Sequence, residues 1–170
     1  MKLTEMFLAE LEAEAKTTRT TIARVPDGHD DWKPHEKSMT LGRLAHLVAT
    51  MPGWIAMMID LDEFDVYPPG AESAPPPPPR TTAELLEAFD EAVAKSKASL
   101  EATTDEHLLT NWTMKAQGHP VNEGPRYLHI RHGVLNHLAH HRGQLTVYLR
   151  LNDAPVPQIY GPTADEGWMG

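Results

Sequence analysis

Cysteine is absent from this sequence of 170 residues. Without cysteine, the chain can form no disulfide bond, offer no thiolate to a metal ion and use no cysteine nucleophile. A bound metal would therefore need histidine, aspartate or glutamate ligands. Any reaction at a thiol would need a thiol that is supplied from outside the chain.

Long apolar runs and clusters of basic residues are also missing. No apolar stretch approaches the roughly 20 residues that are needed to span a bilayer. The N-terminal segment MKLTEMFLAELEAEAK lacks the continuous apolar core of a signal peptide. We therefore expect a cytoplasmic protein that does not bind membranes. The 15 basic residues lie scattered among 24 acidic ones, and the formal net charge is −9. This balance disfavours binding to nucleic acid.

Four segments have the apolar spacing of amphipathic helices. They cover residues of about 3–23, 40–60, 81–100 and 125–151. Pro52 should kink the second segment or end it early, and Thr81 with Glu84 forms a capping box at the start of the third. Residues 103–124 have no sustained period, and no segment shows a confident strand pattern. These features predict one domain, residues 1–170, with an all-α fold that is a four-helix bundle.

The connection between the second and third segments is rich in proline. It reads VYPPGAESAPPPPPRT and contains five consecutive prolines at 75–79. Such a run favours an extended, semi-rigid polyproline connection, and a motif for a proline-binding module is the alternative. A long crossover of this kind suits a bundle in which the neighbouring helices run parallel.

Histidines are concentrated in the last helical segment. Of the ten histidines in the chain, five lie between residues 129 and 141. His141 falls on the apolar stripe of this segment, and His137 lies one turn earlier, so both rings project from the same side. A pair with this spacing can chelate one metal ion from consecutive turns. The alternative is two histidines at the edge of the core that are hydrogen-bonded to neighbours.

The remaining histidines of this segment point elsewhere on the same helical wheel. His140 is rotated away from the apolar stripe, His129 lies near the direction of His140, and His132 lies further round. We therefore expect all three to face solvent.

A metal site would need a third ligand from another part of the chain. The candidates are His29, His35, His46, His107 and His119. His46 lies in the middle of the second helical segment, on the side of small residues such as Gly42 and Gly53. This position fits a surface histidine, and it also fits a face that another helix or a ligand approaches closely. Periodicity leaves both interpretations open.

Three blocks of the sequence resemble a known family. They are WKPHEKSMTLGRLAHLVATMPGW, HLAHHRGQLTVYLR and LNDAPVPQIYGPTADE. Together they are similar to the DinB-like proteins, a superfamily that includes bacterial low-molecular-weight thiol transferases and mycothiol-dependent maleylpyruvate isomerase. The DNA polymerase that shares the name is unrelated.

The resemblance implies a metal site and a type of activity. Carried over residue by residue, the three metal ligands are His46, His137 and His141, whereas His140 is not a ligand. The implied fold is a four-helix bundle with a long crossover after the second helix, and the implied assembly is a homodimer. Three neutral imidazoles leave coordination positions open and suit zinc or nickel.

The function that we expect is a metal-dependent transferase that acts on a small molecule with a low-molecular-weight thiol. The alternative is a bundle that binds a metal or a small ligand without catalysis.

The sequence also allows predictions for four further residues. Gln144 could support the His141 ring, although a packing or surface role fits equally well. Arg142 should pair with an acidic neighbour. Tyr148 and Trp54 should fill the core, because large aromatic side chains dominate core packing, and the alternative is that they line a pocket.

Overall fold

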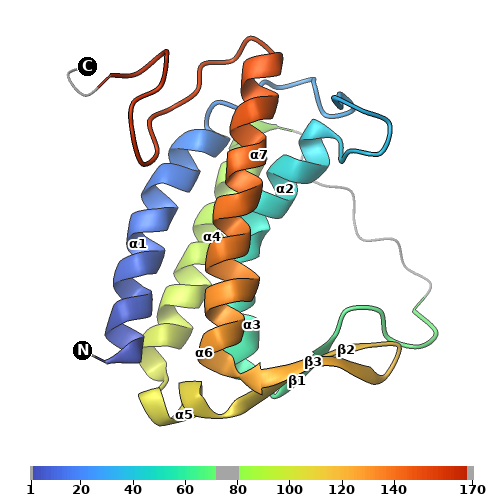
Figure 1. The fold of residues 1–170 in the computed structure, drawn as a ribbon, viewed down its shortest axis with the longest axis vertical. Helices are drawn as coiled ribbons and strands as arrows, with labels where there is room; N and C mark the ends of the chain where they lie inside the picture. Colours follow the sequence, from blue (N-terminus) through green and yellow to red (C-terminus); the bar gives the residue numbers. More distant parts are fainter. Residues whose placement is uncertain (1, 72–80, 168–170) are drawn as a thin grey trace.

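The part of the chain that the computed structural model describes, residues 2–71 and 81–167, forms four helical columns along the long axis of the molecule (Figure 1). In chain order, the columns are α1 (Leu3–Ile22); α2 (Leu41–Thr50), the 3₁₀ turn η1 (Met51–Gly53) and α3 (Trp54–Asp60); α4 (Thr82–Ala102); and α6 (Arg126–His129), the π-helix η2 (Ile130–Asn136) and α7 (His137–Leu151). All four segments that the sequence predicted to be helical are confirmed.

Local signals set the beginnings and breaks of these columns. The predicted capping box is present, with Thr81 Oγ1 accepting from Glu84 N at 3.2 Å and Glu84 Oε2 accepting from Thr81 N at 2.8 Å. Pro52 lies in η1, where it interrupts the second column as predicted. The column continues as α3 because the 3₁₀ turn tolerates a proline near its start.

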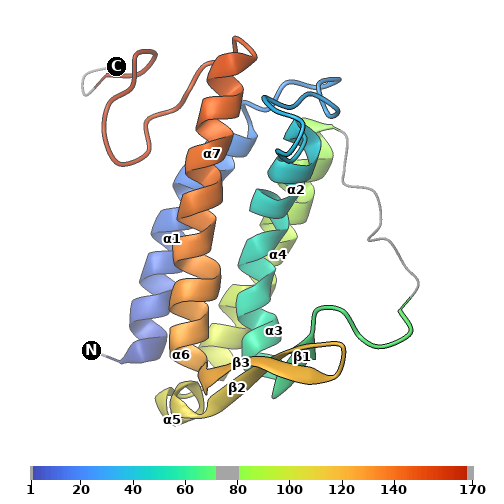
Figure 2. The ribbon, with the colours of Figure 1, turned by 45° about the vertical axis from the view of Figure 1, so that its right-hand side comes forward.

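The second and third columns run in the same direction. Both α2 and α4 begin at the end of the molecule where α1 finishes (Figures 1 and 2). The start of α4 is held there by Thr82, whose backbone N–H donates to Asp27 Oδ1 at 2.7 Å. The parallel arrangement agrees with the long crossover that the sequence suggested. The proline run at 75–79 lies outside the described residues, so its conformation stays a prediction.

A small sheet covers the other end of the columns, and the all-α prediction is therefore wrong (Figure 2). Strands β1 (Glu63–Asp65) and β2 (Asn111–Ala116) pair in parallel, and β3 (His119–Pro125) pairs antiparallel with β2. The short helix α5 (Asp105–Leu109) precedes β2. The β2–β3 hairpin closes through Gln117 and Gly118, with φ of 52° and 79°, as a tight turn with two left-handed residues requires.

The core lies between the columns and consists of the apolar stripes that the sequence predicted. Its fully buried side chains include Phe7, Leu11, Leu44, Val48, Ile55, Leu85, Phe89, Val134, Leu138, Leu145 and Leu149. This burial is the main source of stability for a domain of this kind. None of the described helices combines the length and the apolar character that a bilayer crossing demands.

Candidate metal centre and adjoining pocket

The side chains of His137 and His141 face each other from consecutive turns of α7. Their Nε2 atoms lie 2.8 Å apart, and their ring centroids are separated by 4.5 Å. His141 is buried and His137 is half-buried. The predicted projection from one side of the helix is thus confirmed.

The opposite nitrogen of each ring contacts an oxygen acceptor. His141 Nδ1 lies 2.7 Å from Gln144 Oε1, and His137 Nδ1 lies 3.4 Å from the carbonyl oxygen of Gly133. The amide nitrogen of Gln144 lies 3.1 Å from His140 Nε2. The tautomer in which both Nδ1 atoms carry the proton satisfies these two oxygen acceptors.

In that tautomer, the two nitrogens that face each other are both unprotonated. In neutral rings with Nδ1 protonated, the Nε2 atoms of His137 and His141 each present a lone pair, at a separation of 2.8 Å. Two lone pairs at that distance repel each other unless a cation lies between them or beside them. The cation is either an extra proton or a metal ion.

The π-helix η2 lies directly before this pair. Segments of this kind are rare, and they occur frequently at functional sites. The wider turn also shifts the helical phase between residues 129 and 137. His129 is consequently buried, with its ring centroid 5.0 Å from that of Trp112, so the prediction that it faces solvent is wrong. His132 and His140 are exposed, as predicted.

His46 lies on α2, a helix that packs against α7. It is half-buried, and its Nδ1 is buried without a hydrogen-bond partner among the described residues. The small residues on the same side as His46 allow a neighbouring helix to approach closely. A Cβ built at Gly53 would lie 3.4 Å from the Cβ of Ala92 on α4. Within residues 2–71 and 81–167, however, no three His, Asp or Glu side chains are grouped tightly enough to hold a metal ion. The structure brings His137 to His141 and does not join His46 to them in such a group.

Burial favours the neutral form of His46, His141 and His129. It lowers the pKa of His46. It is also the main cause of the lowered pKa of His141, where the neighbouring His137 and His140 add to the effect and the Gln144 hydrogen bond opposes it. Burial likewise lowers the pKa of His129, with a further contribution from His132. A neutral imidazole is the form that binds a metal ion.

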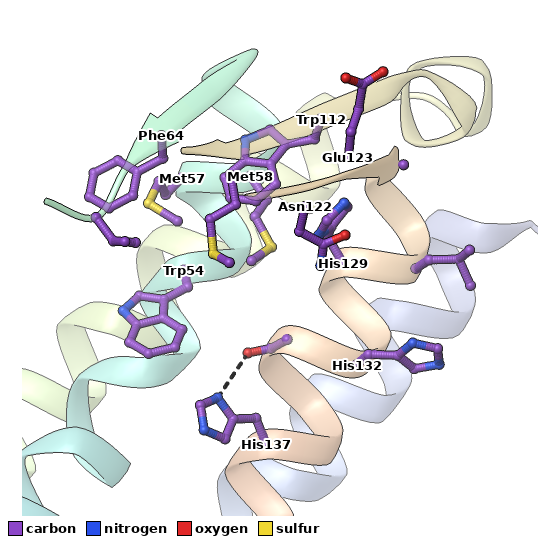
Figure 3. A pocket seen from close by; sticks show the side chains of 15 residues that line it. Trp54, Met57, Met58, Phe64, Trp112, Asn122, Glu123, His129, His132 and His137 are labelled. Carbon is purple, nitrogen blue, oxygen red and sulfur yellow. Dashed lines mark hydrogen bonds between the residues drawn. The ribbon is translucent and has the colours of Figure 1, made fainter. Parts of the chain in front are cut away.

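A cavity of about 710 Å³ adjoins the histidine pair, and we call it the hairpin pocket. Side chains from α3, β1, the β2–β3 hairpin, α6 and η2 line it (Figure 3). Its lining consists of Trp54, Met57, Met58, Phe64, Val66, Trp112, Met114, Asn122, Glu123, Gly124, Leu128, His129, His132, Gly133 and His137. His137 thus belongs both to the histidine pair and to the wall of the pocket.

Sequence reasoning did not find this pocket. Trp54, which was expected in the core, lines the pocket with its ring centroid 5.9 Å from that of His137. Tyr148 is buried as predicted, and its hydroxyl donates to the Met39 carbonyl at 3.2 Å. The spacing of Trp112 and Met114 could have indicated part of the pocket wall, since residues two apart on a strand share a face.

Arg142, which follows His141 in the chain, has the acidic partner that was predicted. Its Nη2 lies 2.7 Å from Glu14 Oε2, and its side chain is almost fully buried. Nη1 donates to Thr17 Oγ1 at 2.8 Å and to Thr18 Oγ1 at 2.9 Å. This cluster ties α7 to α1 and leaves no opening for a ligand at the guanidinium.

Comparison with known proteins assigns this chain to a family. The model of the DinB family matches residues 1–168. The chain is 30% identical to an uncharacterized protein of Bacillus subtilis, YrdA, over 168 residues, which cover 94% of this chain and 89% of that protein.

Two solved structures share the fold. A DinB-like protein from Bacillus cereus superposes with a TM-score of 0.71 at 22% identity, over 92% of this chain and 97% of the other. A second DinB-like protein, YjoA from Bacillus subtilis, superposes with a TM-score of 0.67 at 19% identity, over 91% of this chain and 97% of the other. Together with the match of the family model along nearly the whole sequence, these likenesses lead to one conclusion: the chain belongs to the DinB family.

Proposed function

We propose that this protein binds a divalent metal ion through His46, His137 and His141 and acts as a metal-dependent transferase of a low-molecular-weight thiol. The observation that carries the proposal is the 2.8 Å contact between the Nε2 atoms of His137 and His141, which both present lone pairs when the Nδ1 atoms carry the protons. A cation is the simplest way to stabilise that contact. The chain has no cysteine, so the thiol is a substrate rather than a side chain.

Two features of the residues present fit a metal rather than a shared proton. The lowered pKa of His141 disfavours the protonated imidazolium that a shared proton would require. Among the described residues, His46 Nδ1 is a buried nitrogen without a hydrogen-bond partner, and such a group is costly unless something binds it. His46 is therefore our third ligand, although the described side chains do not form a three-membered group.

Imidazole donors suit zinc or nickel, and with three neutral ligands the ion would lower the pKa of a bound water or thiol. In the transfer, the thiol loses its proton to water and its sulfur bonds to an electrophilic carbon of the second substrate. The leaving group departs from that carbon with the electron pair of the broken bond. The role of Gln144 is to hold the His141 ring with Nε2 unprotonated.

The test combines metal removal with a rate measurement. Untagged protein is assayed with a panel of low-molecular-weight thiols and the electrophile monobromobimane, before and after treatment with a chelator. We expect the rate to fall at least about tenfold without metal and to return when zinc or nickel is added back. A rate that does not respond to the chelator would refute the metal-dependent reaction.

The same samples distinguish catalysis from simple binding. Stoichiometric metal without any chelator-sensitive rate would favour the alternative, a metal- or small-ligand-binding protein. A homodimer, which the resemblance implies, stays a prediction that sedimentation of the untagged protein would test.

A further inference from the structure

The hairpin pocket has the size and lining of a small-molecule site. Its volume of about 710 Å³ falls within the roughly 300–1,000 Å³ that is common for ligand pockets. Figure 3 shows Trp54 and the methionines of α3 on one side, with His129 and His137 on the other. Three methionines belong to the lining, and their flexible thioethers adapt readily to an apolar guest.

Trp112 supplies an unused hydrogen-bond donor at this site. Its side chain lines the pocket and is only 1% exposed. The indole Nε1–H is buried and has no partner among the described residues. A buried donor without an acceptor costs about 1–3 kcal/mol, and a ligand with an acceptor atom would remove that cost.

Without a metal ion, the side chains of the lining do not favour an anionic guest. No lysine or arginine is among the described residues that line the pocket. The whole chain carries a net charge of −9. In the metal-free protein, an anion would therefore lose its hydration without gaining a lysine or arginine partner in the pocket.

We propose that the hairpin pocket binds an uncharged, planar aromatic molecule that carries a carbonyl oxygen as hydrogen-bond acceptor. The aromatic body packs against Trp54 and the methionines, and the carbonyl oxygen accepts from Trp112 Nε1. Binding depends on the pocket alone. That this molecule is the electrophilic substrate rests on the proposed function, because His137 is shared by the pocket and the histidine pair.

The test uses prodan, an uncharged dimethylaminonaphthyl ketone whose emission shifts to shorter wavelength in apolar surroundings. The protein is titrated with prodan after chelator treatment, so that the result does not depend on a metal. We expect saturable binding with a shift to shorter wavelength. The carboxylate of the same ring system serves as the anionic comparison, and it should bind at least about tenfold more weakly. Equal binding of the two compounds would overturn the proposal.

Matched variants locate the binding site. Leu128→Glu places a charge on a pocket residue that is 38% exposed, so folding should tolerate it, and it should weaken prodan binding at least about tenfold. Leu151→Glu makes the same change at a residue that does not line the pocket and is 55% exposed, and it should bind as the parent does. Equal affinity of the two variants would show that prodan binds elsewhere.

A second pair of variants tests the indole donor. Trp112→Phe keeps an aromatic ring and removes the N–H, and we expect prodan affinity to fall about fivefold. Trp32→Phe removes an indole that packs against Tyr148 outside the pocket, and it should have no effect. Unchanged affinity in folded Trp112→Phe would overturn the role of the donor. If that variant fails to fold, the Leu128→Glu comparison still decides whether the pocket binds the probe.

Each of the two proposals can be refuted independently of the other. Prodan binding to chelator-treated protein, together with no chelator-sensitive transferase rate, would support the pocket and refute the thiol transfer. If both hold, Leu128→Glu should raise the KM for monobromobimane and leave kcat close to that of the parent. A lowered kcat at unchanged KM would contradict the assignment of the pocket to the substrate.

Discussion

His141 and Arg142 are neighbours on α7, yet their side chains lie in opposite environments. The Arg142 guanidinium is almost fully buried against α1, where Glu14, Thr17, Thr18 and Tyr160 accept its hydrogen bonds. The Nε2 atoms of His141 and His137 lie 2.8 Å apart, and His137 also lines the hairpin pocket. Arg142 thus has several oxygen partners, whereas the facing nitrogens of the two histidines contact only each other.

The difference separates a structural cluster from a candidate site. Buried polar groups with all their hydrogen bonds made stabilise one packing of the helices. A buried polar group without a suitable partner reduces stability, and it persists where a ligand supplies the missing interaction. The facing Nε2 atoms of the two histidines are candidates for this second class, and so is the indole N–H of Trp112, which has no partner in the described part of the chain.

The largest effect should follow from disrupting the satisfied cluster. Arg142→Met leaves the Glu14 carboxylate without its cation at a site where both side chains are largely buried. We expect the free energy of unfolding, measured by urea denaturation, to fall by about 3 kcal/mol or more. The metal content of the folded fraction should not change. An unchanged unfolding midpoint would show that the cluster is not structural.

A smaller effect should follow at the histidine pair from Gln144→Leu. This change removes the acceptor of the His141 Nδ1 proton, and metal affinity should fall about 10–100-fold in a competition assay with a chelating dye. Stability without metal should change little, because Gln144 is only half-buried. Gln144→Glu retains an oxygen acceptor and should bind metal more tightly than Gln144→Leu. Equal affinity of the two variants would contradict the role of Gln144.

Asp105, a hydrogen-bonded carboxylate away from both clusters, should contribute to the stability of the fold in a pH-dependent way. Backbone hydrogen bonds from Thr4 and Leu3 lower the pKa of Asp105 below its usual value of 3.8. The folded state therefore favours the carboxylate, so this contribution is present above the usual pKa and is lost as pH falls through the lowered one. Asp105→Asn should be less stable than the parent at neutral pH, and the difference in urea midpoint should shrink below about pH 4. A difference that stays constant with pH would contradict this account.

The smallest effect should come from His140→Ala. His140 is exposed and contacts the Gln144 amide at 3.1 Å. We expect unfolding and metal content to remain close to those of the parent, because solvent replaces this contact at little cost. A loss of metal in this variant as large as that in His137→Ala would remove the distinction between the two histidines.

The sequence predicted the helical columns well because their apolar spacing is long and regular. It missed the β2–β3 hairpin because β3 is mostly exposed and β2 fully buries only Trp112, and because Pro120, Gly124 and Pro125 are unusual residues for a strand. Register and pairing there depend on the tight turn at Gln117 and Gly118 rather than on an alternating pattern.

The candidate site was predicted in part. Helical spacing found the His137 and His141 pair, since both lie in regular α7. The same spacing failed for His129, because η2 has wider turns than the α-helix that was assumed. His46 came from the family resemblance, since periodicity on α2 could not separate a ligand from a surface residue. The hairpin pocket joins residues that are far apart in the sequence, and no local pattern predicts it.

Metal analysis of untagged protein tests the central claim most directly. The parent is compared with His46→Ala, His137→Ala and His140→Ala, all purified without added metal or chelator. We expect stoichiometric zinc or nickel in the parent and in His140→Ala, and a loss of nearly all metal in His46→Ala and His137→Ala. Metal content that is the same in all four proteins would contradict the three-histidine site.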